Sequence, residues 1–313
     1  MNKLFFNLLI LIFILLKSSI AYTVENNSIF ILAKVNNSII TNIDIIKEAK
    51  YLRALNPDLK KMNSNEIIKV AKNSMIREKI KENEILKYLE LNLNNPAISS
   101  TIKKFYGRLG LNSENEFKNY LSEFDLTLKF VKKKINIETN WNKLIYLKYN
   151  NLVEIDEKKI KEQAKKNITN NKQNLYLVSE ILFNDISKTK ISEKHKLILQ
   201  NIADIGFKNT AIKFSISDTK KFGGEIGWIE ESQVSTVFKN ILSNLKIGQF
   251  SEPINVPGGK LILMLNDKKI ENIELNYDNE IKKLTLFEKD RKLNQFSYIY
   301  FNKIMKAAKI EIE

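Results

Sequence analysis

The fold of the chain's central region is decided by the stretch Phe222-Gly-Gly-Glu-Ile-Gly-Trp228. It places three of the nine glycines of the 313-residue chain within a few positions, directly before an indole. Glycine is needed where the backbone takes a positive φ or passes close to another group. The stretch therefore predicts a sharp turn that is pressed against an apolar surface.

The segments around this turn have a definite order. The sequence before it predicts a strand, a helix that ends at a glycine and a second helix, at Tyr176–Phe183, Ser192–Ile205 (then Gly206) and Phe207–Phe214. After the turn come an apolar helical segment, a Gly- and Pro-bearing segment and a closing strand, at Val237–Leu242, Leu245–Ile254 and Gly259–Leu265.

This order resembles the parvulin family of peptidyl-prolyl isomerases. The chain matches the family's "HIL" strand, "GGDLGW" turn, "pF…A" helix, "l..G..s.pi" segment and closing "G.HII.L.D" strand between Leu175 and Asp267. The resemblance implies a parvulin-like α/β domain, for which we expect the bounds 171–270.

Catalysis of rotation about an X-Pro bond needs neither a nucleophile nor a metal. It needs only to lower the rotation barrier, which is ~18–20 kcal/mol without a catalyst. An apolar socket for the proline ring and a polar cluster that favours the twisted amide can lower it. The resemblance places Ile226, Val234 and Phe238 on the family's proline-pocket positions, and we expect Trp228 to line or support the same peptide-binding slot. All four residues would also suit ordinary core packing.

The polar cluster departs from the family pattern. Glu180 and Leu261 stand where the family has its two histidines, and Asp218 falls at or next to the position of the family's cysteine or aspartate. Asp218 and Glu180 are therefore the candidate catalytic residues, and weak isomerase activity is expected.

Residues 1–21 have the composition of a signal peptide. Lys3 precedes a run of thirteen mostly apolar residues from Leu4 to Leu16, and Ser19-Ile-Ala21 offers the small residues of a cleavage site. Such a run spans about 20 Å as a helix, which is short of the ~30 Å hydrocarbon core of a membrane. We expect export to the periplasm with cleavage before Tyr22 and no stable membrane insertion afterwards. The alternative is an uncleaved anchor.

The region 22–170 predicts a hairpin followed by long helices. Two β-rich runs flank Asn36-Asn37, and a helix is expected from Asn42 to Ala54. Further helices are predicted at about 63–91, after a capping box at Ser113, and at 126–146. This arrangement resembles the first domain of the SurA family of periplasmic chaperones, through the "a.VN..iIt..Di" pattern at Ala33–Ile45.

A charged helical connector at Asp156–Asn170 and a polar linker at Asn167–Asn174 are expected to lead into the parvulin-like domain. After that domain, region 271–313 predicts a long helix, Tyr277–Ala308, and a short strand. The SurA resemblance implies that this helix completes the amino-terminal domain. The predicted fold class is thus α+β, with one parvulin-like domain inserted into a helical chaperone domain.

Composition excludes several classes of site. The chain has no cysteine and a single histidine, His195, so thiol, triad and zinc chemistry are not expected, and we predict no metal and no cofactor. Its net charge of +15 comes from lysines scattered through every segment, which favours a solvated surface over a nucleic-acid site.

The sequence leaves three functions open. The first is a periplasmic chaperone that binds unfolded outer-membrane or other exported polypeptides, with a weak prolyl isomerase. The second is an active peptidyl-prolyl cis-trans isomerase that assists the folding of exported proteins. The third is a basic structural or nucleic-acid-associated protein, against which the export signal argues.

Overall fold

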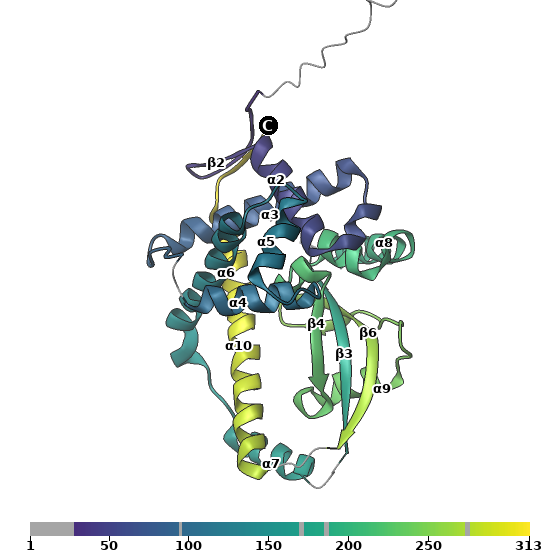
Figure 1. The fold of residues 1–313 in the computed structure, drawn as a ribbon. Coiled ribbons are helices and arrows are strands. Elements are labelled where there is room, and N and C mark those ends of the chain that lie inside the picture. Colours follow the sequence, from purple (N-terminus) through teal and green to yellow (C-terminus); the bar gives the residue numbers. More distant parts are fainter. Residues whose placement is uncertain (1–27, 94–95, 169–171, 185–187, 273–275) are drawn as a thin grey trace, which may run out of the picture. The chain divides into compact units, whose positions relative to one another are not determined.

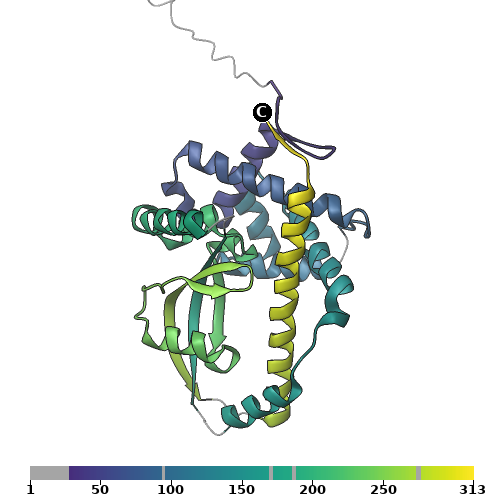
Figure 2. The same cartoon turned by 180° about the vertical axis from the view of Figure 1, so that it is seen from behind.

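Two antiparallel sheets and a set of long helices make up the part of the chain that the structure describes (Figures 1 and 2). The computed structural model describes residues 28–93, 96–168, 172–184, 188–272 and 276–313. Residues 31–313 form one unit, and residues 28–30 have no regular secondary structure. The predicted α+β class is confirmed, whereas the predicted signal peptide lies outside the described residues.

The smaller sheet has the strand order β2-β1-β7. The hairpin β1 (Ile31–Val35) and β2 (Ser38–Thr41) turns at Asn36, whose φ of 52° is left-handed, as the Asn-Asn pair predicts. The third strand, β7 (Ile310–Ile312), pairs with β1. The carboxy-terminal strand therefore completes a sheet that the amino-terminal hairpin begins.

The helices that follow are α2 (Asn42–Leu55), α3 (Ser64–Ile85), α4 (Pro96–Arg108), α5 (Glu114–Ser122), α6 (Leu128–Tyr149) and α7 (Glu157–Ile168). The side chains of Asn63 and Ser113 cap α3 and α5 as predicted, by accepting hydrogen bonds from the backbone N–H groups of Glu66 and Glu116. The prediction that this helix extends to residue 91 is wrong, because α3 ends at Ile85 and the next three residues form turns.

The larger sheet has the order β4-β3-β6-β5, with β3 (Lys172–Phe183), β4 (Glu225–Glu230), β5 (Ile254–Val256) and β6 (Gly259–Asn272) all antiparallel. The predicted linker at 167–174 is partly wrong. Lys172, Gln173 and Asn174 already pair with Asn272, Glu271 and Ile270, so backbone pairing includes this polar segment in the strand.

A helix packs on each face of this sheet. One apolar layer joins Val178, Leu263 and Leu265 to Leu242 of α9 (Thr236–Asn244). The other joins Ile181 and Ile262 to Ile198 of α8 (Lys188–Phe214), which is interrupted at Gly206 (φ 83°) as predicted.

The long helix α10 (Tyr277–Ala307) lies against α3, α6 and α7 (Figure 2). Tyr300 and Phe301 join the core that also holds Ile80, and Trp141 of α6 stacks on Tyr300 with ring centroids 5.8 Å apart. The Trp141 indole N–H donates to Ser297 Oγ at 2.8 Å. Among the described residues, no helix has the length and apolar character required to cross a membrane.

Candidate functional site

The glycine turn fixes the backbone around the candidate polar cluster. Gly223 and Gly224 take φ values of 68° and 82°, and a Cβ on Gly224 would overlap with the carbonyl oxygen of Glu180. The Glu180 N–H in turn donates to the Gly224 carbonyl at 2.8 Å. Only glycine fits so close to β3 at this position, as the sequence predicts.

The Glu180 carboxylate accepts two hydrogen bonds from the short helix η3 (Asp218–Phe222) and the residue before it. Ser217 Oγ donates to Glu180 Oε1 at 2.5 Å, and Thr219 Oγ1 donates to the same oxygen at 2.9 Å. Burial raises the pKa of Glu180 above its ordinary value, against the opposing effect of these two hydrogen bonds. The arrangement makes Glu180 a fixed acceptor surrounded by hydroxyl groups.

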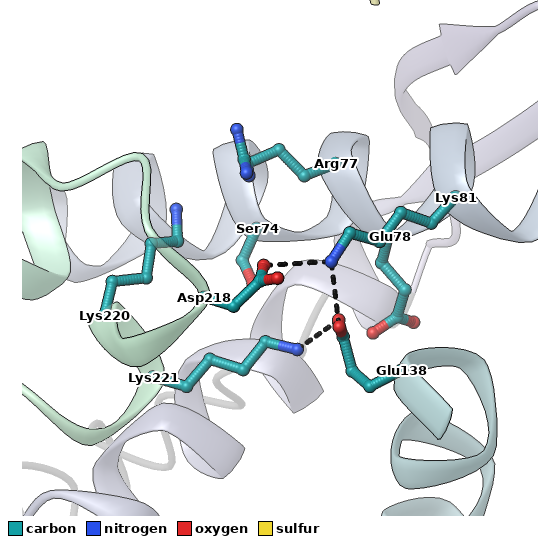
Figure 3. A pocket seen from close by; sticks show the side chains of 8 residues that line it. All are labelled: Ser74, Arg77, Glu78, Lys81, Glu138, Asp218, Lys220 and Lys221. Carbon is teal, nitrogen blue, oxygen red and sulfur yellow. Dashed lines mark hydrogen bonds and ion pairs between the residues drawn. The ribbon is translucent and has the colours of Figure 1, made fainter. Parts of the chain in front are cut away.

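The other candidate acid, Asp218, points toward the helical part of the chain. Its Oδ1 lies 2.9 Å from Nζ of Lys81 on α3, and the same amine lies 2.8 Å from Oε2 of Glu138 on α6 (Figure 3). Lys221 also pairs with Glu138. Burial alone would lower the pKa of Lys81, but Asp218 and Glu138 outweigh it and raise that pKa above the ordinary value. Asp218 is thus engaged in an ion network between α3, α6 and η3.

Three family positions lie on one face of the large sheet. Leu261 is buried in the apolar layer under α9, and Phe238 of α9 packs against the same layer. Glu180 lies two residues after Val178 on β3, so it points to the same face as Val178, which belongs to this layer. Val234 is half-buried just before α9. The structure therefore brings Glu180, Leu261 and Phe238 to the same side of the sheet.

Trp228 and Ile226 differ in their placement. Ile226 falls at a β-bulge, because Val178 pairs with Gly227 and Ser179 with Glu225, and it is 38% exposed. Trp228 is 42% exposed and alternates along β4 with Ile229, which packs on the α9 layer. Trp228 therefore lies on the opposite face from Phe238, under the amine of Lys269 at 4.7 Å.

The single histidine, His195, is half-buried, with its ring stacked on Phe183 at a centroid separation of 6.1 Å. In the described ranges, no three His, Cys, Asp or Glu side chains gather in a way that could hold a metal ion.

Comparison with known families matches residues 175–267 to the rotamase family described as the PPIC-type PPIASE domain. Residues 175–267 form a PpiC-type rotamase domain. The match begins on β3 and ends on β6, so it contains the glycine turn and both candidate acids.

Three curated relatives extend this result. Chaperone SurA of Pseudomonas aeruginosa is 32% identical over 92 residues, which is 29% of this chain and 22% of the relative. Periplasmic chaperone PpiD of Haemophilus influenzae is 31% identical over 74 residues, or 24% of this chain and 11% of the relative. Chaperone SurA of Hahella chejuensis is 21% identical over 212 residues, or 63% of this chain and 49% of the relative. The chain is SurA-like, and it spans about half or less of the length of these three relatives.

The sequence did not reveal the helical partners of the PpiC-type domain. Lys81, Glu138 and Arg77 lie far from Asp218 along the chain, yet all four side chains line one cavity. In the sequence they are charged residues on amphipathic helices, and nothing in their spacing distinguishes them from solvated ones.

Proposed function

We propose that this protein is a periplasmic chaperone that binds unfolded exported polypeptides, including outer-membrane proteins, through its PpiC-type domain, and that its prolyl isomerase activity is weak. The observation that carries the proposal is the state of the family's polar positions. Leu261 is apolar and buried, and Asp218 is paired with Lys81. The pocket positions Ile226, Val234 and Phe238 nevertheless remain apolar.

Apolar pocket positions beside altered polar positions favour peptide binding without isomerisation. Catalysis needs groups that stabilise the twisted amide more than the planar one. An apolar surface binds both forms by removing apolar area from water, at about 25 cal/mol per Å², and so holds a chain without accelerating its isomerisation. The SurA and PpiD relatives, whose names describe chaperones, support this function, and the signal-like segment 1–21 supports export.

The second candidate, an active isomerase, is favoured by one observation. Glu180, Ser217 and Thr219 form a connected hydrogen-bonded group beside the glycine turn, and Glu180 lies on the same face of the sheet as the pocket position Phe238. Such a group could polarise a bound amide.

Ile226→Asp tests the binding site. Ile226 is 38% exposed, so the change is expected to alter the free energy of unfolding by about 0.5 kcal/mol or less, while it places a charge on the apolar surface. The affinity for a fluorescently labelled unfolded outer-membrane protein, measured by anisotropy, should fall about tenfold.

The matched control is Leu286→Asp on α10, where an equally large apolar residue is 62% exposed and lies outside the PpiC-type domain. This control should bind as the wild type does. Unchanged affinity in Ile226→Asp, or equal losses in both variants, would remove the PpiC-type domain from the binding site.

A further inference from the structure

A small cavity lies between the helical part and the PpiC-type domain. It is lined by Ser74, Arg77, Glu78 and Lys81 of α3, Glu138 of α6, and Asp218, Lys220 and Lys221 of η3 (Figure 3). Its volume is about 20 Å³, more than the roughly 10–15 Å³ that one water molecule requires. The cavity therefore has room for one water-sized group, such as one oxygen atom of a bound anion.

The charges around this cavity do not balance. Its lining contains four cationic and three anionic side chains. Glu138 is shared by Lys81 and Lys221, and Asp218 pairs with Lys81. The third carboxylate, Glu78, pairs with Lys134, which lies outside the lining, at 2.6 Å. Every carboxylate of the lining is thus already engaged.

Two cations remain without a carboxylate. No ion pair or hydrogen bond engages the Lys220 amine within the ranges that the structure describes. The Arg77 guanidinium donates to the carbonyl oxygen of Ile216 at 3.2 Å and lies 4.2 Å above the ring of Phe301. One carbonyl uses only part of the donor capacity of a guanidinium.

The positive charges of Arg77 and Lys220 repel each other. Figure 3 shows the ends of Arg77 and Lys220 on one side, turned away from the ion network of Lys81, Asp218 and Glu138. Burial, with the positive charges of Arg77 and Lys221, lowers the pKa of Lys220 to about 7. Arg77 and Lys220 are both half-buried, and a partly desolvated cation without a carboxylate partner disfavours folding, so this pair at a cavity is a candidate ligand site.

We propose that Arg77 and Lys220 bind a small oxyanion, a carboxylate or a phosphate, in this cavity. A guanidinium presents two parallel N–H donors to such an anion, and an ammonium adds a point charge. Because Arg77 lies on α3 and Lys220 on η3, the bound anion would join the helical part to the segment that carries Asp218. This site differs from the peptide-binding surface, and its existence does not depend on chaperone activity.

The test measures binding of sodium acetate and of inorganic phosphate separately, by isothermal titration calorimetry and by the shift in melting temperature at constant ionic strength. At least one of the anions should bind saturably to the wild type. Lys220→Met should weaken that binding by about tenfold or more, because it removes a charged donor. The control Lys69→Met removes an exposed lysine of α3, the helix that carries Arg77, and this lysine does not line the cavity, so the affinity should change less than twofold.

Lys220→Met removes an unpaired cation, so its melting temperature without anion should equal or exceed that of the wild type, and a loss of binding cannot then be ascribed to unfolding. Tighter binding of acetate identifies the ligand as a carboxylate, and tighter binding of phosphate identifies it as a phosphate. The proposal is overturned if neither anion saturates, or if Lys220→Met binds as well as the wild type.

Discussion

Removal of residues 276–313 should unfold the helical part of the chain while the PpiC-type domain stays folded. This segment supplies Leu284, Tyr300 and Phe301, which are all at least 90% buried. Each large apolar side chain contributes about 1.5–3 kcal/mol by burial, and the loss also exposes Trp141 and removes its hydrogen bond to Ser297. Their sum is comparable to the ~5–15 kcal/mol that stabilises a whole domain.

Hydrogen exchange measures the predicted unfolding separately for each helix and strand. In the truncated protein, amides of α3 and α6 should exchange without protection, whereas the paired amides of β3 and β6 should remain protected. A control truncation after Ala308 removes only β7 and should leave α3 and α6 protected, because the buried aromatic residues of α10 are retained. Protected amides in α3 and α6 after the longer truncation would show that α10 does not stabilise the helical part.

Lys134→Met should destabilise the protein by about 3–5 kcal/mol, because it leaves the buried Glu48 and the half-buried Glu78 without their cation. Lys134 of α6 is 4% exposed and pairs with Glu48 of α2 and Glu78 of α3. Glu48 is 1% exposed and also accepts a hydrogen bond from Ser74 at 2.6 Å. Burial alone would lower the pKa of Lys134, but the two glutamates outweigh it and raise that pKa.

Urea denaturation of two further variants isolates the cause. Lys133→Met removes the neighbouring lysine, which is 53% exposed and lies 3.3 Å from Glu82, and should cost about 1 kcal/mol or less. The double variant Lys134→Met/Glu48→Gln should recover part of the lost stability, since one unpaired charge is removed with the other. If the double variant is less stable than Lys134→Met alone, the loss comes from packing rather than from the unpaired carboxylates.

The local features of the fold could be predicted from the sequence. Glycines 223, 224 and 206 mark backbone conformations that other residues rarely adopt, and Asn63 and Ser113 begin helices by capping them. These signals act within a few residues, so the sequence displays them directly. The end of α3 was harder to predict, because Leu89 continues the apolar pattern in turns that still pack on the core.

Features that depend on distant partners could not be predicted. Lys172 to Asn174 are polar and were expected in a linker, yet pairing with β6 makes them part of a strand. Asp218 was predicted as a candidate catalytic acid of the polar cluster, and its ion pair with Lys81 joins residues 137 positions apart. The sequence gives the residue types on both sides of such contacts but not which of them meet.

The central claim is that this chain holds unfolded polypeptides and barely isomerises them. The most direct test compares aggregation suppression with protease-coupled isomerisation of a proline peptide, for the wild type and Asp218→Asn. Asp218 is 53% exposed at its side chain, so loss of its charge should cost about 1 kcal/mol of stability or less. The account predicts strong aggregation suppression by both proteins and only slight isomerisation by the wild type. A fast wild-type isomerisation that falls about tenfold in Asp218→Asn, equivalent to about 1.4 kcal/mol of transition-state stabilisation, would contradict it.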